Sequence, residues 1–168
     1  SVAQCFFRAM KAIPSVVLIT GTTSGIGRAL LNYYRDLNVK VIAVNRRKIA
    51  DEPENNVDVH IIDITNAGEV SKLLDKLSQS NLMPDVFILS AGINRVDNAS
   101  RLSFDTFRDV IETNLMGVMT FVSEIQNLDL TNRTVLAISS TSNIIANPGN
   151  LGYHLSKRDL HRAFQIFA

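Results

Sequence analysis

Two residues near the end of the chain, Tyr153 and Lys157, have the types and the spacing that acid–base chemistry requires. They lie four positions apart in a stretch predicted to be helical, so both side chains fall on one face about one turn apart. A phenol with a pKa near ~10 exchanges protons poorly at neutral pH unless a nearby cation stabilises its phenolate, and Lys157 supplies such a cation. The alternative is an ordinary surface pair, because the Tyr-x-x-x-Lys spacing alone is weak evidence. Ser140, at the end of a predicted strand, precedes Tyr153 by thirteen residues.

A second candidate site is the glycine-rich turn that follows a predicted strand beginning at Val16. The strand is a continuous run of branched apolar residues, which is typical of a parallel strand buried on both faces. A helix predicted for residues 25–36 then begins at the turn, and its N-terminus presents N–H groups and a partial positive charge to an anion. On this interpretation Gly21 makes the tight turn, Gly25 lets a pyrophosphate approach the backbone, and Gly27 lets the helix lie close to the strand. The alternative is a loop that merely turns the chain.

The end of the second predicted strand, residues 39–45, bears on which dinucleotide such a turn binds. Asn45 is followed by Arg46, Arg47 and Lys48, with no carboxylate among them. An acid at this place binds the ribose 2′-hydroxyl, whereas an arginine accommodates a 2′-phosphate through paired hydrogen bonds. The charge pattern therefore favours NADP over NAD. A solvated basic loop is the alternative.

Strands alternating with helices predict an α/β fold, a doubly wound parallel sheet of the Rossmann type with strand order 3-2-1-4-5. The cofactor crevice then lies between the first and fourth strands, where the winding reverses. The last predicted helix begins at residue 151. The other predicted elements are a third strand over 57–64, a helix with Thr65 as its N-cap, a fourth strand over 85–90, one long helix over 103–127 and a fifth strand over 134–140.

Smaller features mark the carboxyl end of this sheet. Ala91 and Gly92 suit a backbone that approaches a ligand, although a bare turn is also possible. Asn114 lies in the middle of the long helix, so it either points to water or binds a group inside. The fifth strand has no later strand to pair with, and its apolar residues 135–138 therefore predict association or missing chain.

Composition sets outer limits on function. The chain has 168 residues, with 17 Lys and Arg against 16 Asp and Glu, which gives no reason to expect a nucleic acid or membrane partner. Cys5 is the single cysteine, so we expect no disulfide framework, no metal site and a cytoplasmic location. Residues 15–168 are expected to form one domain. Residues 1–14 are an extension that packs on the domain, a targeting remnant or residues added for expression.

Four motifs in this order resemble the short-chain dehydrogenase/reductase family over residues 16–168. They are the turn over residues 20–27, the segment ending in Ala91-Gly92, the mid-helix Asn114, and a serine ahead of Tyr-x-x-x-Lys. Departures are Ser90 where the family has asparagine and Asn143 where it commonly has glycine. The family also continues past the tyrosine helix with a further strand and a substrate-covering region, so the resemblance implies a C-terminally short chain, complete on the adenine side and open on the nicotinamide side.

The resemblance assigns roles to four catalytic positions. Tyr153 is the acid that protonates a carbonyl oxygen, or the base in the reverse reaction, and Ser140 orients that oxygen. Lys157 binds the nicotinamide ribose and lowers the tyrosine pKa, while Asn114 holds water in a proton relay. Asp63 matches an adenine contact and Arg46 the 2′-phosphate contact. The implied cofactor contacts are Gly21, Thr23, Ser24, Gly25, Ile26, Gly27, Asn45, Arg46, Asp63, Ile64, Ala91, Gly92, Tyr153 and Lys157.

These observations leave three hypotheses. The first is an NADP(H)-dependent oxidoreductase that moves a hydride between nicotinamide and a small carbonyl or secondary alcohol. The second is a catalytically incomplete nucleotide-binding module of the same fold, and the third is a partner-binding domain that associates through the fifth strand. The resemblance also implies a homo-oligomer formed through the helices over residues 104–127 and 153–168.

Overall fold

Five parallel strands form the centre of the computed structural model, which describes residues 13–48, 55–96, 102–128, 132–143 and 149–167. They pair in the order β3-β2-β1-β4-β5, so the predicted doubly wound sheet is confirmed, including the reversal between β1 and β4. Leu18 at the centre of the sheet stands opposite Ile42 on one side and Phe87 on the other. The strands are β1 (Val16–Thr20), β2 (Lys40–Asn45), β3 (Val57–Ile61), β4 (Val86–Leu89) and β5 (Thr134–Ala137).

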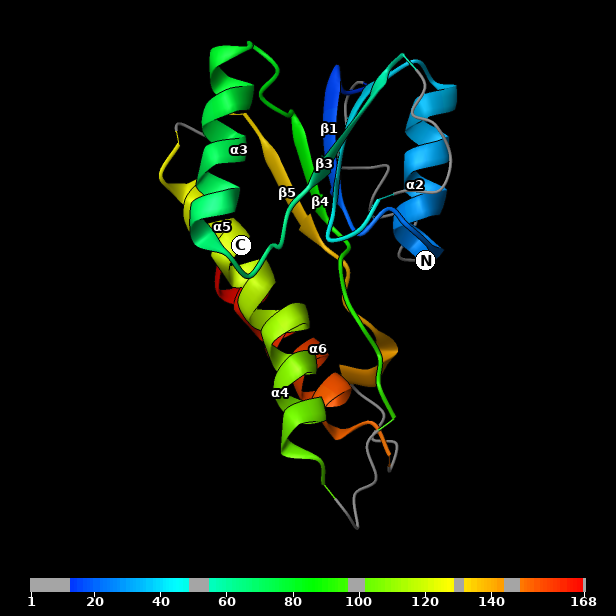
Figure 1. The fold of residues 1–168 in the computed structure, drawn as a ribbon, viewed down its shortest axis with the longest axis vertical. Helices are drawn as coiled ribbons and strands as arrows, with labels where there is room; N and C mark the ends of the chain where they lie inside the picture. The colour runs from blue at the N-terminus through cyan, green and yellow to red at the C-terminus, as the bar shows by residue number, and fades with distance from the viewer. Residues whose placement is uncertain (1–12, 49–54, 97–101, 129–131, 144–148, 168) are drawn as a thin grey trace.

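Helices cover both faces of the sheet (Figure 1). Helix α2 (Gly25–Asp36) lies on one face, where Leu31 and Tyr34 pack against alternate residues of the strands. The opposite face carries α3 (Ala67–Gln79), α5 (Gly117–Gln126) and α6 (Leu151–Phe167), which enclose Phe87 and the fully buried Phe121. The central strands are therefore buried on both faces, which explains why their sequences are apolar without alternation.

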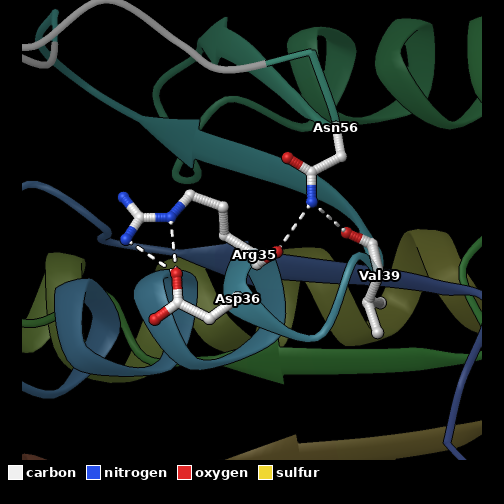
Figure 2. A network of polar contacts seen from close by, with 4 residues as sticks. All are labelled: Arg35, Asp36, Val39 and Asn56. Carbon is white, nitrogen blue, oxygen red and sulfur yellow. Dashed lines mark hydrogen bonds and ion pairs between the residues drawn. The ribbon is translucent and has the colours of Figure 1, made fainter.

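The junction between α2 and the next two strands is held by one asparagine (Figure 2). The side-chain amide of Asn56 donates to the carbonyl oxygens of Arg35, at 3.0 Å, and Val39, at 3.2 Å. The helix ends at Asp36, and Asn38 after it has a φ of 57°, in the left-handed region that asparagine tolerates. The Arg35 carbonyl near the end of α2, which already accepts the N–H of Asn38, thus gains a second donor, and the start of β3 is tied to the start of β2.

Three strands end earlier than predicted. The third ends at Ile61 rather than residue 64, the fourth at Leu89 rather than residue 90, and the fifth at Ala137 rather than residue 140. In each case the prediction included residues that follow the strand. Ile62 and Ile138 still donate one backbone hydrogen bond each to the neighbouring strand, to the carbonyls of Asn45 and Leu89, so the sequence pattern does not separate them from β3 and β5.

The predicted N-cap of the following helix was also wrong. Helix α3 is capped by Asn66, whose Oδ1 accepts the N–H of Glu69 at 3.2 Å. Thr65 instead donates its hydroxyl to Asp63 Oδ1 at 2.8 Å. The carboxylate of Asp63 lies two residues before Thr65 and competes for the threonine hydroxyl, so the cap moves one residue along.

The long helix predicted for residues 103–127 is interrupted. It consists of α4 (Phe104–Ile111), a π-helical turn η1 (Glu112–Met116) and α5, which follow one another without a break. A π turn holds an extra residue, and such turns occur mostly at functional sites. Here the turn contains Asn114, whose side chain is completely buried.

Strand β5 is the edge of the sheet next to β4, and its four residues are half-buried. In the described part of the chain, no helix is long and apolar enough to cross a membrane. Except for Ile13 and Pro14, the extension expected at residues 1–14 lies outside the described residues.

Candidate active site

A cavity of about 670 Å³ opens at the carboxyl edge of the sheet, where β1, β2 and β4 end. All fourteen residues predicted as cofactor contacts line it, from Gly21 to Lys157. Of the four predicted catalytic residues, Tyr153 and Lys157 line the cavity, whereas Asn114 and Ser140 are not among its lining residues. The crevice predicted at the reversal of strand order is therefore present. The other lining residues are Val44, Arg47, Ile62, Ser90, Ile93, Asn94, Arg95, Thr113, Ile138 and Ser139.

The glycine turn forms the floor of this cavity. A Cβ at Gly27 would lie 2.2 Å from the carbonyl oxygen of Gly21, so only glycine lets α2 approach the end of β1 so closely. Gly21 has a φ of 74°, and its own Cβ would lie 2.6 Å from Ala91 Cα. Gly25, with a φ of 58°, has open space where a Cβ would stand. Two of the three glycines thus allow close packing, and Gly25 leaves room for a ligand.

The N-terminus of α2 lacks the groups that neutralise the starts of α3 and α4. Ser24 at the N-cap makes no side-chain capping bond, and the first turn contains no acidic residue. Helices α3 and α4, in contrast, are capped by Asn66 and Ser103 and have an acid in the first turn. The helix dipole at α2 therefore faces the cavity without a carboxylate to offset it. This arrangement and the open space above Gly25 fit the pyrophosphate of a dinucleotide.

A buried pair locks the turn to the end of β2. Asn45 and Thr22 are 3% and 0% exposed, and Asn45 Oδ1 accepts the backbone N–H of Thr22 at 2.7 Å. The amide nitrogen of Asn45 in turn donates to Thr22 Oγ1 at 2.8 Å. The Asn45 side chain is thus directed at the glycine turn, while the neighbouring Arg46 and Arg47 are exposed and line the cavity.

Asp63 and Ile64, which follow the end of β3, line another side of the cavity. Asp63 is the single acidic residue among the described residues that line the cavity, and its Oδ1 accepts the N–H of Thr65 at 3.0 Å. Ile64 is 7% exposed and packs against Gly117, where a Cβ would lie 2.8 Å from Ile64 Cγ1. Among the charged residues of the described lining, Arg46, Arg47, Arg95 and Lys157 outnumber Asp63, which suits a polyanionic ligand.

Tyr153 and Lys157 project from α6 into the opposite wall. Lys157 is 5% exposed, and its Nζ donates to the carbonyl oxygen of Ile138 at 2.8 Å. Burial lowers the pKa of Lys157 from 10.5 to about 8, because the ammonium loses hydration. The same nitrogen lies 5.9 Å from the centre of the Tyr153 ring. The predicted surface pair is thus ruled out for Lys157, and the cation lies within electrostatic reach of the phenol.

Asn114 fastens the loop after β4 to the helical layer. Its Oδ1 accepts the N–H of Ile93 at 2.7 Å, and its Nδ2 donates to the Ile93 carbonyl at 2.8 Å and to Ser156 Oγ at 3.2 Å. A Cβ at Gly92 would lie 3.2 Å from Asn114 Oδ1 and 3.5 Å from Lys157 Nζ, so the loop lies closely against both residues. Both amide protons of Asn114 are engaged, and one lone pair of Oδ1 remains for a water.

Comparisons with known proteins identify the family. The family model described as short chain dehydrogenase matches residues 15–167. The chain belongs to the short-chain dehydrogenase family. Its relatives include a 3-oxoacyl-(acyl-carrier-protein) reductase of Thermotoga maritima, 28% identical over 158 residues that cover 88% of this chain and 64% of the relative. The corresponding reductase of Rickettsia prowazekii is 32% identical over 150 residues, 85% of this chain and 61% of the relative. The chain thus spans less than two thirds of the length of these two reductases.

Solved structures of dehydrogenases share the fold of this short-chain dehydrogenase. A short chain dehydrogenase from Leptospira borgpetersenii with bound NAD+ matches with a TM-score of 0.85 at 23% identity, over 92% of this chain and 64% of that one. A 4-hydroxyisoleucine dehydrogenase complexed with NADH matches with a TM-score of 0.77 at 29% identity, over 92% of this chain and 68% of that one. Both of those structures hold a nicotinamide dinucleotide.

The serine predicted as catalytic lies beside the cavity lining. Ser140 Oγ accepts the N–H of Ser142 at 3.1 Å, in the short helical turn η2 (Thr141–Asn143). Its neighbour Ser139 lines the cavity and donates its hydroxyl to the carbonyl oxygen of Lys157 at 3.2 Å. The two serines therefore have different contacts: Ser139 holds the backbone of α6, and Ser140 holds the turn η2 that precedes it.

Sequence reasoning missed three residues that shape this site. Thr22 was visible inside the glycine turn, but its bond to Asn45 depends on a contact across 23 residues. Arg47 follows Arg46 in the same basic run and lines the cavity with it. Ser156 lies on the same helix as Tyr153, and its burial gave no signal in the sequence. In the part of the chain that the structure describes, no cluster of three metal-binding side chains occurs.

Proposed function

We propose that this short-chain dehydrogenase transfers a hydride between NADP(H) and a small carbonyl compound or secondary alcohol, with Tyr153 as the acid or base. One observation carries the proposal. A cavity with an uncapped helix N-terminus and three glycines on its floor has Tyr153 and the buried Lys157 on its opposite wall. The first part suits a dinucleotide phosphate and the second suits proton transfer, and both belong to the same space.

When bound, the nicotinamide supplies or accepts the hydride. The protein's own residues place the reacting groups and move the proton. Tyr153 donates its phenolic proton to the carbonyl oxygen during reduction and takes it back during oxidation. The ammonium of Lys157 favours the phenolate because it is desolvated and close, so its charge is weakly screened. We assign Ser140 to orienting the substrate oxygen, because it directly follows Ser139, which lines the cavity, and its Oγ accepts rather than donates the hydrogen bond that it shares with Ser142.

A proton must reach Tyr153 again after each reduction. Lys157 has a pKa of about 8, so near neutral pH it is close to its own titration point and can exchange a proton with water. Asn114 lies behind it with a free lone pair on Oδ1. We therefore assign Asn114 to holding a water next to Lys157, as well as to fixing the loop at Ile93.

The preference for NADP rests on the end of β2. Arg46 and Arg47 are exposed beside the cavity, and the Asn45 amide is committed to Thr22. A 2′-phosphate therefore meets guanidinium groups and no carboxylate at this end of β2. Two structural neighbours hold NAD+ or NADH, which makes NAD(H) the competing ligand in any test.

Turnover and binding together test the proposed reaction. The similar reductases and the 4-hydroxyisoleucine dehydrogenase suggest the first substrates to test, a 3-oxoacyl thioester for reduction and 4-hydroxyisoleucine for oxidation. We expect Tyr153→Phe to lower kcat by roughly 10²- to 10⁴-fold, the usual contribution of a general acid, while the Kd of NADPH changes little. Tyr33→Phe on α2, outside the cavity lining, is the matched control and keeps wild-type kcat. Binding of NADPH without turnover of any substrate would favour the incomplete nucleotide-binding module, and no binding would leave the partner-binding domain.

The cofactor preference has a separate test. Calorimetry with NADPH and NADH compares wild type with Arg46→Ala and Lys48→Ala. Because a charged hydrogen bond contributes about 1.5–3 kcal/mol, we expect Arg46→Ala to weaken NADPH binding by roughly 10- to 100-fold and to leave NADH binding unchanged. Lys48 belongs to the same basic run but lies outside the cavity lining, so its variant keeps both affinities. Equal losses in the Arg46 and Lys48 variants would indicate a general charge effect and refute a specific 2′-phosphate contact.

We further propose a homo-oligomer formed through the helical layer of α4, α5 and α6. Large apolar side chains are exposed there, with Phe104 at 61%, Met116 at 53% and Ile166 at 72%. Light scattering across a concentration series tests this assembly, and a monomer at every concentration would refute it. We also propose a cytoplasmic location, which fractionation of cells that produce the protein would test.

A further inference from the structure

Ser156 is a buried hydroxyl within the helix that carries Tyr153 and Lys157. It has no exposed surface and lies outside the cavity lining. Its Oγ donates a hydrogen bond to the backbone carbonyl of Tyr153 at 2.8 Å and accepts one from Asn114 Nδ2 at 3.2 Å. Serine is a mediocre helix former, and burying its hydroxyl is unfavourable unless the hydroxyl is hydrogen-bonded. Both bonds are therefore needed to keep a serine at this position.

The carbonyl that Ser156 binds is the one that links the two proposed catalytic residues. In an α-helix the carbonyl of residue i accepts the N–H of residue i+4, which for Tyr153 is the N–H of Lys157. A serine hydroxyl that bonds back to an earlier carbonyl shares this acceptor and adjusts the local helix geometry. Ser156 thus acts on the single helical turn that sets the spacing of the phenol and the ammonium.

The same hydroxyl connects this turn to the opposite wall of the cavity. Asn114 holds Ser156 with one amide proton, and its remaining bonds fix both backbone groups of Ile93. Ile93 follows Gly92 and lines the cavity. A continuous series of hydrogen bonds therefore joins the loop after β4, the π turn and the backbone of α6.

We propose that Ser156 is a positioning residue, whose buried hydroxyl joins Asn114 to the Tyr153 carbonyl and so fixes Tyr153 and Lys157 relative to the loop at Ile93. The inference rests on the proposed function for its effect on rate. The loop and Asn114 are closely packed, because a Cβ at Gly92 would lie only 3.2 Å from Asn114 Oδ1. Misplacement of reacting groups by about 1 Å costs on the order of a hundredfold in rate.

Kinetics of Ser156→Ala test the effect on catalysis. Alanine keeps the helix and removes both hydrogen bonds, so Tyr153 and Lys157 lose their link to Asn114. We expect kcat to fall about ten- to a hundredfold, with KM for the substrate and Kd for NADPH within a factor of about two. Ser78→Ala is the matched control, because Ser78 is an exposed helical serine on α3 and lies outside the cavity lining. If Ser156→Ala does not fold, Ser156→Cys, whose slightly larger thiol is a weak donor and acceptor, weakens both hydrogen bonds and should lower kcat in the same direction.

A second measurement does not depend on turnover. The titration of the Lys157 ammonium is followed by NMR in wild type and Ser156→Ala. We expect its midpoint to rise from about 8 toward 10.5 in the variant, because a loosened turn admits water to the ammonium. A wild-type protein without turnover would refute the proposed function, and the shift would still decide the role of Ser156. Wild-type kcat together with an unmoved midpoint, whatever the loss of thermal stability, would overturn the inference and leave Ser156 with a structural role only.

Discussion

The buried ammonium of Lys157 makes the stability of the fold depend on alkaline pH. Its pKa is about 8 in the folded chain and 10.5 as the ordinary value, so between these pH values the unfolded chain binds more protons than the folded one. The free energy of unfolding contributed by this group therefore rises with pH across that window. At about 1.36 kcal/mol per pKa unit, the whole effect is on the order of 3 kcal/mol. Roughly 2 kcal/mol of it develops between pH ~7 and pH ~9.5.

Urea unfolding of wild type and Lys157→Met at these two pH values measures the effect. The Met variant removes the titrating group together with the hydrogen bond that Lys157 donates to the Ile138 carbonyl. Tyr34 also titrates at alkaline pH, but burial raises its pKa above 10.0. Its ionisation therefore lowers the stability of the fold only above the pH range compared here. Lys72→Met, on an exposed position of α3, is the matched control and should show no pH-dependent difference.

The comparison uses the difference between wild type and variant at each pH. We expect the stability of wild type relative to Lys157→Met to increase by about 2 kcal/mol from pH ~7 to ~9.5. A change within roughly 0.5 kcal/mol, the usual range for surface substitutions, would mean that the ammonium is hydrated in the folded protein. In that case the electrostatic effect assigned to Lys157 on Tyr153 would also be refuted.

Three further substitutions test the packing around the cavity. Gly27→Ala places a Cβ 2.2 Å from a carbonyl oxygen and should lower the free energy of unfolding in urea by about 1–3 kcal/mol. Gly68→Ala is the control, because its Cβ would meet nothing closer than 3.4 Å. Equal losses in the two variants would contradict the close approach of α2 to β1. Asn45→Leu leaves the buried N–H of Thr22 without its acceptor, so we expect the free energy of unfolding to fall by about 1–3 kcal/mol and calorimetry to show weaker NADPH binding. Unchanged NADPH binding would show that the bond between Asn45 and Thr22 does not shape the glycine turn. Asn66→Ala removes the cap of α3 and should cost about 1 kcal/mol by thermal unfolding, while wild-type stability would reassign the cap.

Both ends of α2 and the start of α6 could be predicted because they depend on local patterns, and the strand order followed from the alternation of strands and helices with right-handed crossovers. The run before Gly21 is apolar throughout, and the glycines after it mark the turn, so the first strand and helix followed from the sequence. Strand ends were less predictable, since apolar Ile62 and Ile64 continue the pattern of β3 beyond its last residue. Where the chain leaves the sheet depends on hydrogen bonds such as that between Asp63 and Thr65, which a pattern of apolar residues does not contain.

The candidate site could be predicted where the residue type and its spacing along the chain indicate a chemical role. Tyr153, Lys157 and the glycines belong to that group, and the structure brings them to one cavity. The π turn at Asn114 was not predictable, because the apolar spacing runs through it unchanged. The pKa of Lys157 and the bonds of Ser156 depend on burial and on contacts between elements distant in the chain.

The central claim is that a dinucleotide lies across the glycine turn with its nicotinamide beside Tyr153. A crystal structure of the chain with NADPH tests it most directly. We expect the pyrophosphate against the N-terminus of α2 over Gly25, the 2′-phosphate at Arg46, and the nicotinamide ring next to Tyr153 and Lys157. Density for NADPH elsewhere, or a nicotinamide ring directed away from Tyr153, would contradict the account.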